Sequence, residues 1–181
     1  SIGAIVAAAG SSSRMGGVDK IFALILGIPL IAYALDQLET YSPVGEVALV
    51  VDEGSRKRAE TLVRQRGYSK VSRICPGGAR RQDSVRCGLE SLNPCDWVVV
   101  HDGARPCLDH PMLARGLEAA EDSGAAVAGV PVKDTIKVVS SQDLVVDTPA
   151  REGLWAAQTP QVFRYALLRD AHRSCKLPVT D

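Results

Sequence analysis

Three segments of the sequence combine small residues with charged side chains, a pattern suited to holding phosphate groups. They span residues 10–14, with Lys20 a little further on, residues 77–84 and residues 101–105. Small residues let backbone N–H groups approach an anion closely. Arginine and lysine add positive charge, and the planar fork of arginine matches phosphate. The segments therefore predict a site for a phosphorylated ligand.

The first segment predicts a cradle for the phosphates of a nucleoside triphosphate. Arg14 and Lys20 flank small residues, and the N-terminus of a following helix would add positive potential. It is not a P-loop, because G-x-x-x-x-G-K-[ST] is missing, and it is not a dinucleotide fingerprint, because Ser12 and Met15 replace the required glycines. The alternative is a tight strand-to-helix turn without a ligand.

The second segment offers groups that could recognise a nucleotide base. Backbone amides near Gly78 and the hydroxyl of Ser84 provide directional hydrogen bonds, and Arg81 could stack on the ring or bond to it. The alternative is a loop that only begins a helix, with Asp83 as the N-cap of residues 84–92. We expect this cap to form in either case.

The third segment places Asp102 directly after an apolar strand. A carboxylate beside a triphosphate is a natural Mg²⁺ ligand, with water and phosphate oxygens completing the coordination. Arg105 could hold a second phosphorylated substrate. The alternative for Asp102 is a helix cap or an ion pair with Arg105, and His101 is expected to be a packed or hydrogen-bonded residue rather than a catalyst.

Alternating strands and helices must position these segments. We expect buried strands at residues 4–9, 47–51, 71–75, 97–101 and 125–130, and helices at residues 30–38, 56–66, 84–92, 112–123 and 164–174. This alternation predicts an α/β fold with a largely parallel sheet. Ligands of such sheets bind beyond the carboxyl ends of the strands, so the three segments should converge on one site.

The pattern changes after residue 130. Residues 136–139 and 144–146 resemble two short strands joined by a polar segment, which predicts a β-hairpin arm. Residues 153–163 then return to extended structure. Trp97 and Trp155 are expected to be packing residues, because neither lies among the polar groups of a loop.

Composition narrows the class of protein. The 181 residues correspond to about one domain, and 21 basic residues balance 21 acidic ones, which argues against a nucleic-acid partner. Five cysteines without a C-x-x-C pair fit buried thiols in a reducing cytosol better than a disulfide framework, and the three histidines lack zinc spacing. The longest apolar stretch, residues 21–35, is too short to span a bilayer. We therefore expect a cytoplasmic protein with no membrane partner.

Five motifs occur in order along residues 5–181: AAAGSSSRMG with Lys20, GGARRQDSV, VHDGARP, PVKDTIK and LWAAQTPQVF. This ordered set resembles the 2-C-methyl-D-erythritol 4-phosphate cytidylyltransferases of the non-mevalonate isoprenoid pathway. The resemblance implies a Rossmann-like nucleotidyltransferase fold, in which a twisted, mostly parallel sheet has helices on both faces and a protruding β-arm. It implies one domain over residues 1–181, with the arm at about residues 134–151.

The implied reaction transfers a cytidylyl group from CTP to 2-C-methyl-D-erythritol 4-phosphate and releases pyrophosphate. By resemblance, the residues that bind CTP are Ala8, Ala9, Gly10, Arg14 and Lys20 at the triphosphate, Gly78, Arg81 and Ser84 at the cytosine, and Gly103 at the ribose. Ser12 stands where the family usually has glycine, and its hydroxyl could donate to a phosphate. Gly103 stands where alanine is usual.

The resemblance also implies a magnesium ion, a second substrate site and a second subunit. Asp102 matches the metal ligand, and the residues around methylerythritol phosphate are Arg105, Thr135, Arg151 and Thr159. Catalytic roles fall to Arg14, Lys20 and Arg151. The arm of the family interlocks with a second subunit, so Thr135 and Arg151 would serve the neighbour's site in a homodimer.

Two further interpretations stay open at this point. A ribitol 5-phosphate cytidylyltransferase shares the CTP loops, although Ala104 and Lys137 favour methylerythritol phosphate. A non-catalytic nucleotide-binding member of the family is the other, and the retained charged residues argue against it. The family pattern continues past residue 181, so its C-terminal part is expected to be absent here. We expect the sequence to be the ordered portion of a longer chain, because an exposed half-sheet invites aggregation.

Overall fold

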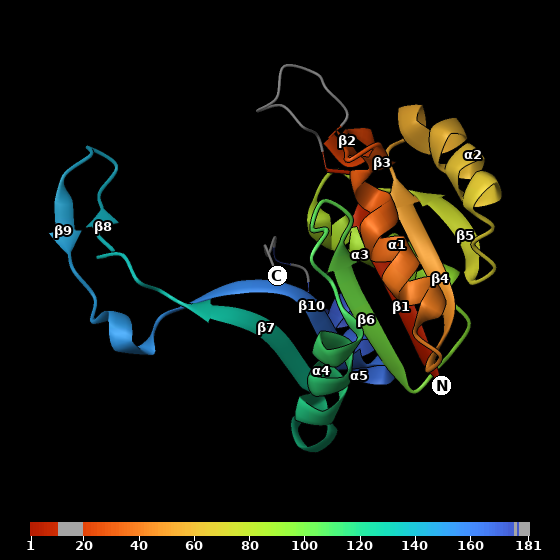
Figure 1. Cartoon of the computed structure of the whole chain (residues 1–181). Coiled ribbons are helices and arrows are strands. Elements are labelled where there is room, and N and C mark those ends of the chain that lie inside the picture. Colours follow the sequence, from red (N-terminus) through yellow and green to blue (C-terminus); the bar gives the residue numbers. More distant parts are fainter. Residues whose placement is uncertain (11–19, 176, 178–181) are drawn as a thin grey trace.

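The computed structural model describes residues 1–10, 20–175 and 177, and a six-stranded sheet forms its centre (Figure 1). The strand order is β5-β4-β1-β6-β10-β7. The bounds are β1 (Ile2–Ala8), β4 (Val44–Val51), β5 (Val71–Pro76), β6 (Trp97–Asp102), β7 (Ala125–Pro131) and β10 (Trp155–Arg164). Strands β5, β4, β1 and β6 are mutually parallel, whereas β10 runs antiparallel to both of its neighbours. The predicted mostly parallel sheet is confirmed.

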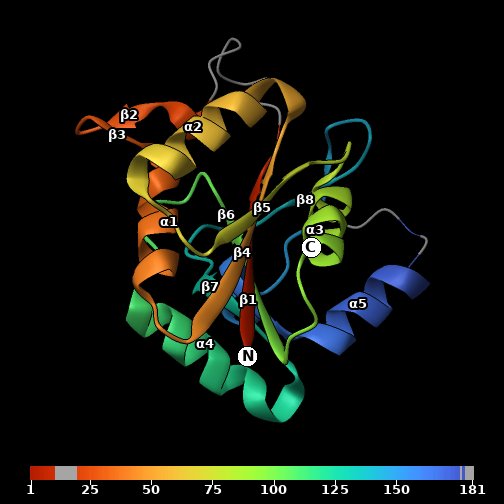
Figure 2. The same ribbon diagram turned by 90° about the vertical axis from the view of Figure 1, so that its right-hand side faces the viewer.

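Helices cover both faces of this sheet (Figure 2). Helices α1 (Leu30–Thr40), α2 (Arg56–Arg66) and α4 (His110–Ser123) lie on one face, and α3 (Arg81–Ser91) and α5 (Tyr165–Ser174) lie on the other. Successive side chains of a strand point to opposite faces. In β1, Val6 therefore packs with Leu35 in one core, and Ile5 packs with Leu89 in the other.

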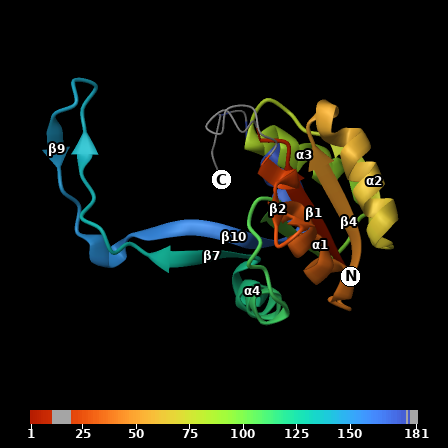
Figure 3. The ribbon, with the colours of Figure 1, turned by 45° about the horizontal axis from the view of Figure 1, so that its top comes forward.

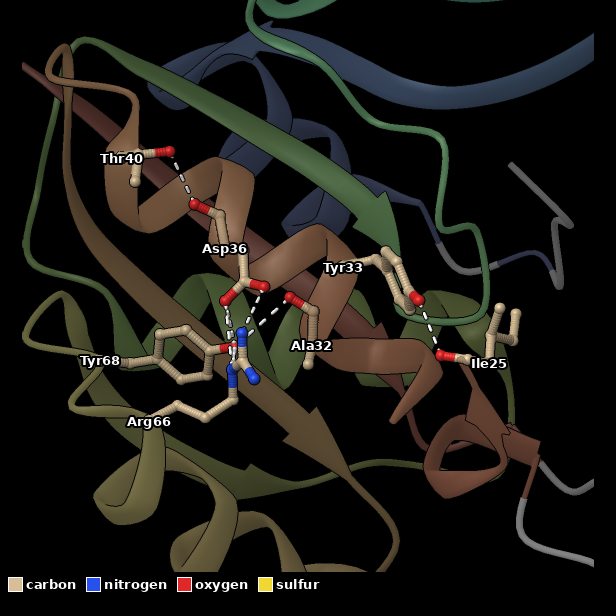
Figure 4. A network of polar contacts seen from close by, with 7 residues as sticks. All are labelled: Ile25, Ala32, Tyr33, Asp36, Thr40, Arg66 and Tyr68. Carbon is tan, nitrogen blue, oxygen red and sulfur yellow. Dashed lines mark hydrogen bonds and ion pairs between the residues drawn. The ribbon is translucent and has the colours of Figure 1, made fainter. Parts of the chain in front are cut away.

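A polar cluster fastens α1 to the end of α2 (Figure 4). Both oxygens of Asp36 accept from the guanidinium of Arg66, at 3.2 Å from Nε and 2.6 Å from Nη2. The hydroxyl of Tyr68 donates to Asp36 at 2.7 Å and accepts from Arg66 Nε at 2.8 Å. Burial, and then the neighbouring Asp36 carboxylate, raise the pKa of Tyr68. We call Asp36, Arg66 and Tyr68 the Asp36 cluster.

A small hairpin precedes α1. It lies within the apolar stretch of residues 21–35, where no strand was predicted from the sequence. Strands β2 (Leu24–Ile25) and β3 (Ile28–Pro29) pair antiparallel. Both turn residues have positive φ, 51° at Leu26 and 79° at Gly27, which is typical of two-residue hairpin turns. The Tyr33 hydroxyl donates to the carbonyl of Ile25 at 2.7 Å and so ties the hairpin to α1 (Figure 4).

The outer ends of β7 and β10 leave the sheet and lead into an arm, defined here as residues 132–154 (Figures 1 and 3). Strands β8 (Val138–Val139) and β9 (Val145–Asp147) form the predicted hairpin within it, and a 3-10 turn, η4 (Arg151–Gly153), follows. The prediction that Trp155 is a packing residue is wrong for this chain, since 62% of the residue is exposed. The reason is that β10 extends past the helices that would cover it.

Two sequence expectations concern the molecule as a whole. In the described part of the chain, no helix has both the length and the apolar character needed to cross a membrane. The five cysteines are all free thiols, as expected, but the prediction that they are buried is wrong, because Cys107 and Cys175 are exposed and the other three are half-buried. Burial raises the pKa of the Cys75 and Cys95 thiols, so these two are less reactive than exposed thiols.

Candidate active site

The carboxyl ends of β1, β5 and β6 bring the predicted loops to one edge of the sheet. Close approach between them depends on glycine. A Cβ added to Gly77 would lie 2.1 Å from the Cβ of Ala9, and one added to Gly103 would lie 2.9 Å from the Cβ of Ala8. Both distances are shorter than real side chains allow, so the end of β1 at Ala8 and the next residue, Ala9, pack directly against the second and third segments. These parts form one rim, as predicted, and residues 11–14 of the first segment lie outside the described residues.

The start of α3 differs from the prediction. The helix begins at Arg81, and its N-cap is Arg80, whose backbone is extended and whose side chain makes no capping bond. The prediction that Asp83 is the N-cap is therefore wrong. Asp83 lies in the first turn, where it pairs with Arg80 at 2.8 Å and with Arg86 at 3.5 Å. The hydrogen bond from Arg80 holds the pKa of Asp83 below its usual value.

Gly78 and Ser84, both predicted at the base-recognising loop, contact each other. The Ser84 hydroxyl accepts from the Gly78 N–H at 3.1 Å and donates to the Arg80 carbonyl at 3.2 Å. Ser84 is buried, with 6% of the residue exposed. This hydroxyl therefore holds the loop in shape and keeps the backbone of residues 77–79 at the rim.

Asp102, the last residue of β6, lies between two arginines. Arg81 Nε donates to Oδ1 at 3.1 Å, and Arg105 Nε donates to Oδ2 at 3.0 Å. The ion pair with Arg105, which was the alternative interpretation of Asp102, is present, and Arg81 adds a second one. We call these three residues the Asp102 cluster. One negative charge faces two positive charges, so the cluster has a net charge of about +1 and favours an anionic ligand.

The donor set at the rim fits magnesium held by one carboxylate. Mg²⁺ commonly takes one or two carboxylates and fills its other positions with water and substrate phosphates. Each Asp102 oxygen accepts one arginine bond and has a further lone pair. Within residues 1–10, 20–175 and 177, no three histidine, cysteine or acidic side chains lie close enough to form a metal site by themselves.

Polar side chains buried behind the rim form a second layer, of which the sequence analysis named His101 and Thr159 and missed Gln161. Gln161 is 6% exposed and accepts from Arg81 Nη2 at 3.1 Å, so β10 orients an arginine that belongs to α3. Thr159 and His101 are 7% and 1% exposed and hydrogen-bond each other at 3.0 Å. Burial lowers the pKa of His101, which favours the neutral imidazole. The expectation of a hydrogen-bonded rather than catalytic histidine fits this environment.

The structure keeps two predicted residues apart from the rim. Thr135 and Arg151 belong to the arm, which extends away from the Asp102 edge in two views (Figures 1 and 3). Both are exposed, and Arg151 Nη1 donates to the carbonyl of Lys133 at 2.7 Å. Gly10 and Lys20 are exposed next to the rim elements, whereas Ser12 and Arg14 lie outside the described residues.

Fold and rim together define a Rossmann-like nucleotidyltransferase. Among solved structures, the 4-diphosphocytidyl-2C-methyl-D-erythritol synthase of Anaerococcus prevotii matches with a TM-score of 0.85 at 26% identity, covering 99% of this chain and 78% of that one. The 2-C-methyl-D-erythritol 4-phosphate cytidylyltransferase of Thermus thermophilus matches with a TM-score of 0.74 at 32% identity, covering 99% and 79%.

Sequence comparison narrows the class to one family. The family described as 2-C-methyl-D-erythritol 4-phosphate cytidylyltransferase (IspD) matches residues 2–181. A protein of that name from Dehalococcoides mccartyi is 48% identical over 99% of this chain and 79% of the relative. The chain belongs to the 2-C-methyl-D-erythritol 4-phosphate cytidylyltransferase family.

Proposed function

We propose that this chain transfers the cytidylyl group of CTP to 2-C-methyl-D-erythritol 4-phosphate, as the name of its family states. The strongest structural support is the Asp102 cluster, a net positive group at the edge of the sheet where nucleotides bind. The products are 4-diphosphocytidyl-2-C-methyl-D-erythritol and pyrophosphate.

The chemistry requires positioning and charge neutralisation rather than a nucleophilic side chain. A phosphate oxygen of the sugar phosphate attacks the α-phosphorus of CTP, and the bond to the β-phosphate oxygen breaks as pyrophosphate leaves. Holding the two substrates in line supplies a large part of such rate enhancements. Positive groups that oppose the developing charge supply much of the remainder.

The rim divides into a CTP part and a sugar-phosphate part. The first loop would hold the triphosphate through Ala8, Ala9, Gly10, Ser12, Arg14 and Lys20, with Arg14 and Lys20 opposing the developing charge. The loop of Gly78, Arg81 and Ser84 would recognise the cytosine, with Gly103 next to the ribose. Their shared edge supports this assignment, because Gly77 packs against Ala9 and Gly103 packs against Ala8.

Asp102 would hold a magnesium ion at the rim. When bound, such an ion neutralises negative charge on the transferring phosphate. Arg105 lies on the other side of Asp102 and would receive the phosphate of methylerythritol phosphate, with Thr159 behind it.

The free thiols support a cytoplasmic location for the enzyme.

The arm would complete the site of a second copy of this chain. Thr135 and Arg151 are exposed on it, distant from the Asp102 edge of their own chain (Figure 1). Apolar side chains are exposed along the arm and its base, among them Val138, Val139, Val145 and Trp155. Exposed apolar groups at this density mark an interaction surface. A homodimer would cover them and bring Arg151 into the partner's site as a catalytic residue.

Pyrophosphate release tests the reaction itself. The protein is incubated with CTP, Mg²⁺ and either methylerythritol phosphate or ribitol 5-phosphate. We expect turnover with methylerythritol phosphate only. Turnover with ribitol 5-phosphate alone would assign the chain to the alternative substrate, and no turnover with either would favour a non-catalytic nucleotide-binding protein.

Mixed dimers test the role of the arm. The variants Asp102→Asn and Arg151→Ala are each expected to be inactive alone. When they are co-expressed, roughly half of the dimers are mixed and each contains one intact site, so about a quarter of wild-type activity should return. Arg151 acting within its own chain would give no recovery. Thr61→Ala, a change on α2, serves as the matched variant that should be active alone.

A further inference from the structure

A chain of hydrogen bonds runs under the Asp102 cluster through two buried side chains. The Asp102 N–H donates to Thr159 Oγ1 at 3.2 Å. Thr159 Oγ1 lies 3.0 Å from His101 Nδ1, and His101 Nε2 lies 3.0 Å from the carbonyl oxygen of Arg105. The chain therefore begins at the backbone of Asp102 and ends at the backbone of Arg105.

The direction of each bond follows from the chemistry of its partners. The carbonyl of Arg105 can only accept, so His101 Nε2 carries the hydrogen. In a neutral imidazole Nδ1 is then an acceptor, and the hydroxyl of Thr159 must donate to it. Every polar atom of the two side chains is thereby used, which agrees with the absence of unpartnered buried side-chain atoms in the described part of the chain.

These bonds hold the segment that carries the two charged residues. His101 and Asp102 belong to β6, and Thr159 comes from β10, the neighbouring strand. Arg105 lies outside any strand, and a hydrogen bond from its N–H to the Asp102 carbonyl closes the turn at 3.0 Å. The imidazole holds the far end of that turn from inside the protein.

We propose that His101 and Thr159 are positioning residues that set the backbone of residues 102–105, and with it the placement of the Asp102 carboxylate and the Arg105 guanidinium. This inference rests on the proposed function, because it assigns those two groups to metal and sugar phosphate. Thr159 acts through the loop in this scheme, since its single hydroxyl hydrogen is engaged by His101.

Two substitutions at one position separate positioning from packing. Thr159→Val keeps the shape of the side chain and removes the hydroxyl, whereas Thr159→Ser keeps the hydroxyl and removes a methyl group. We expect the valine variant to lose about ten- to a hundredfold in kcat, because misplacement by about 1 Å costs about that much. KM for the sugar phosphate should rise, and KM for CTP should change little. The serine variant should recover most of the activity.

A second threonine–histidine pair provides the matched control. Thr40 Oγ1 lies 3.1 Å from His110 Nε2, and Thr40 ends α1 at the opposite edge of the sheet from Asp102. Thr40→Val therefore removes a threonine–histidine contact, together with the 2.7 Å bond from the Thr40 hydroxyl to the Asp36 carbonyl, without touching the rim. Its kinetics with both substrates should equal those of the wild type.

The imidazole itself provides a readout that does not depend on turnover. Nitrogen-15 chemical shifts of His101 distinguish its two neutral tautomers. We expect the Nε2–H form in the wild type and in Thr159→Ser, and a changed Nδ1 shift in Thr159→Val.

Two results would overturn the inference: an Nδ1–H tautomer in the wild type, or valine and serine variants with equal kinetics. A wild type that is inactive with methylerythritol phosphate would instead overturn the proposed function, and the spectrum would still decide whether the hydrogen-bond chain exists.

Discussion

Two clusters in this molecule both pair an aspartate with arginine and differ in charge balance. In the Asp36 cluster one arginine meets one carboxylate through two parallel bonds, at 3.2 and 2.6 Å (Figure 4). In the Asp102 cluster each carboxylate oxygen meets a different arginine, at 3.1 and 3.0 Å. The first cluster is electrically balanced, whereas the second has an unbalanced positive charge.

Exposure does not separate the two clusters. The side chains of Asp36 and Arg66 are 35% and 34% exposed, and those of Asp102 and Arg81 are both 27% exposed. The differences are the surplus guanidinium and the position at the carboxyl ends of the strands. A balanced pair stabilises the packing of α1, while a pair with surplus charge at the sheet edge is suited to a phosphorylated ligand.

The same substitution in each cluster should have opposite effects, and the effect at the rim is the largest that we expect. Asp102→Asn should lower kcat about 10²–10³-fold, by analogy with the loss of other charge-stabilising groups. Its free energy of unfolding should change by less than about 1 kcal/mol, because partly exposed ion pairs contribute little. Pyrophosphate release and urea unfolding measure the two quantities.

Asp36→Asn is the matched variant and should reverse this pattern, with unchanged kcat and a measurable loss of stability, because Asp36 also accepts a 2.7 Å bond from the buried Tyr68 hydroxyl. A fall in kcat of similar size at both positions would show that the comparison is wrong and that both carboxylates act through folding.

Removing the hydroxyl of Tyr68 tests the Asp36 cluster, and its effect should be smaller than that of the Asp102 substitution. Tyr68→Phe keeps the buried ring and removes the bonds to Asp36 and Arg66. We expect the free energy of unfolding to fall by about 1.5–3 kcal/mol, the usual contribution of hydrogen bonds to charged groups. Denaturant titration measures it, and Tyr33→Phe, at the exposed side of α1, is the comparison variant. An unchanged midpoint would contradict the assigned role.

Raising the pH above neutral tests the Tyr68 hydroxyl again, and its effect on stability should be the smallest that we expect. The pKa of Tyr68 is raised in the folded protein, so the folded state holds its proton more tightly than the unfolded state. This contribution to stability is complete below about pH 10, the ordinary tyrosine pKa, and declines as the pH rises above it. Stability measured from neutral pH upward should therefore fall less steeply in Tyr68→Phe. Equal slopes would disprove the linkage.

The local patterns of the sequence were sufficient to predict the sheet and the edge of the sheet at which a ligand is expected to bind. Apolar runs predicted the central strands, and the charged helix predicted at residues 56–66 has the same bounds as α2. The convergence of the three rim segments followed from parallel topology alone, because parallel strands share one carboxyl edge. Residues of this kind are predictable because their environment is set by neighbours in sequence.

The errors and omissions concern residues whose partners are distant in sequence or lie outside the sheet. Asp83 has the composition of an N-cap, but the extended Arg80 starts the helix earlier and takes Asp83 as a partner. Gln161 gave no signal, because its contact with Arg81 spans 80 positions. Trp155 was expected in a core, and only the departure of β10 from the sheet explains its exposure.

Asp102 belongs to the central ladder itself. It pairs with Ala7 of β1, and the next residue, Gly103, donates its N–H to the carbonyl of Ala7 at 2.8 Å. Amide hydrogens in such a position exchange with solvent only when the innermost strands separate, whereas exposed segments open at almost no cost. Among the described residues, the backbone that carries the Asp102 carboxylate is therefore expected to open more slowly than the exposed arm that carries Thr135 and Arg151.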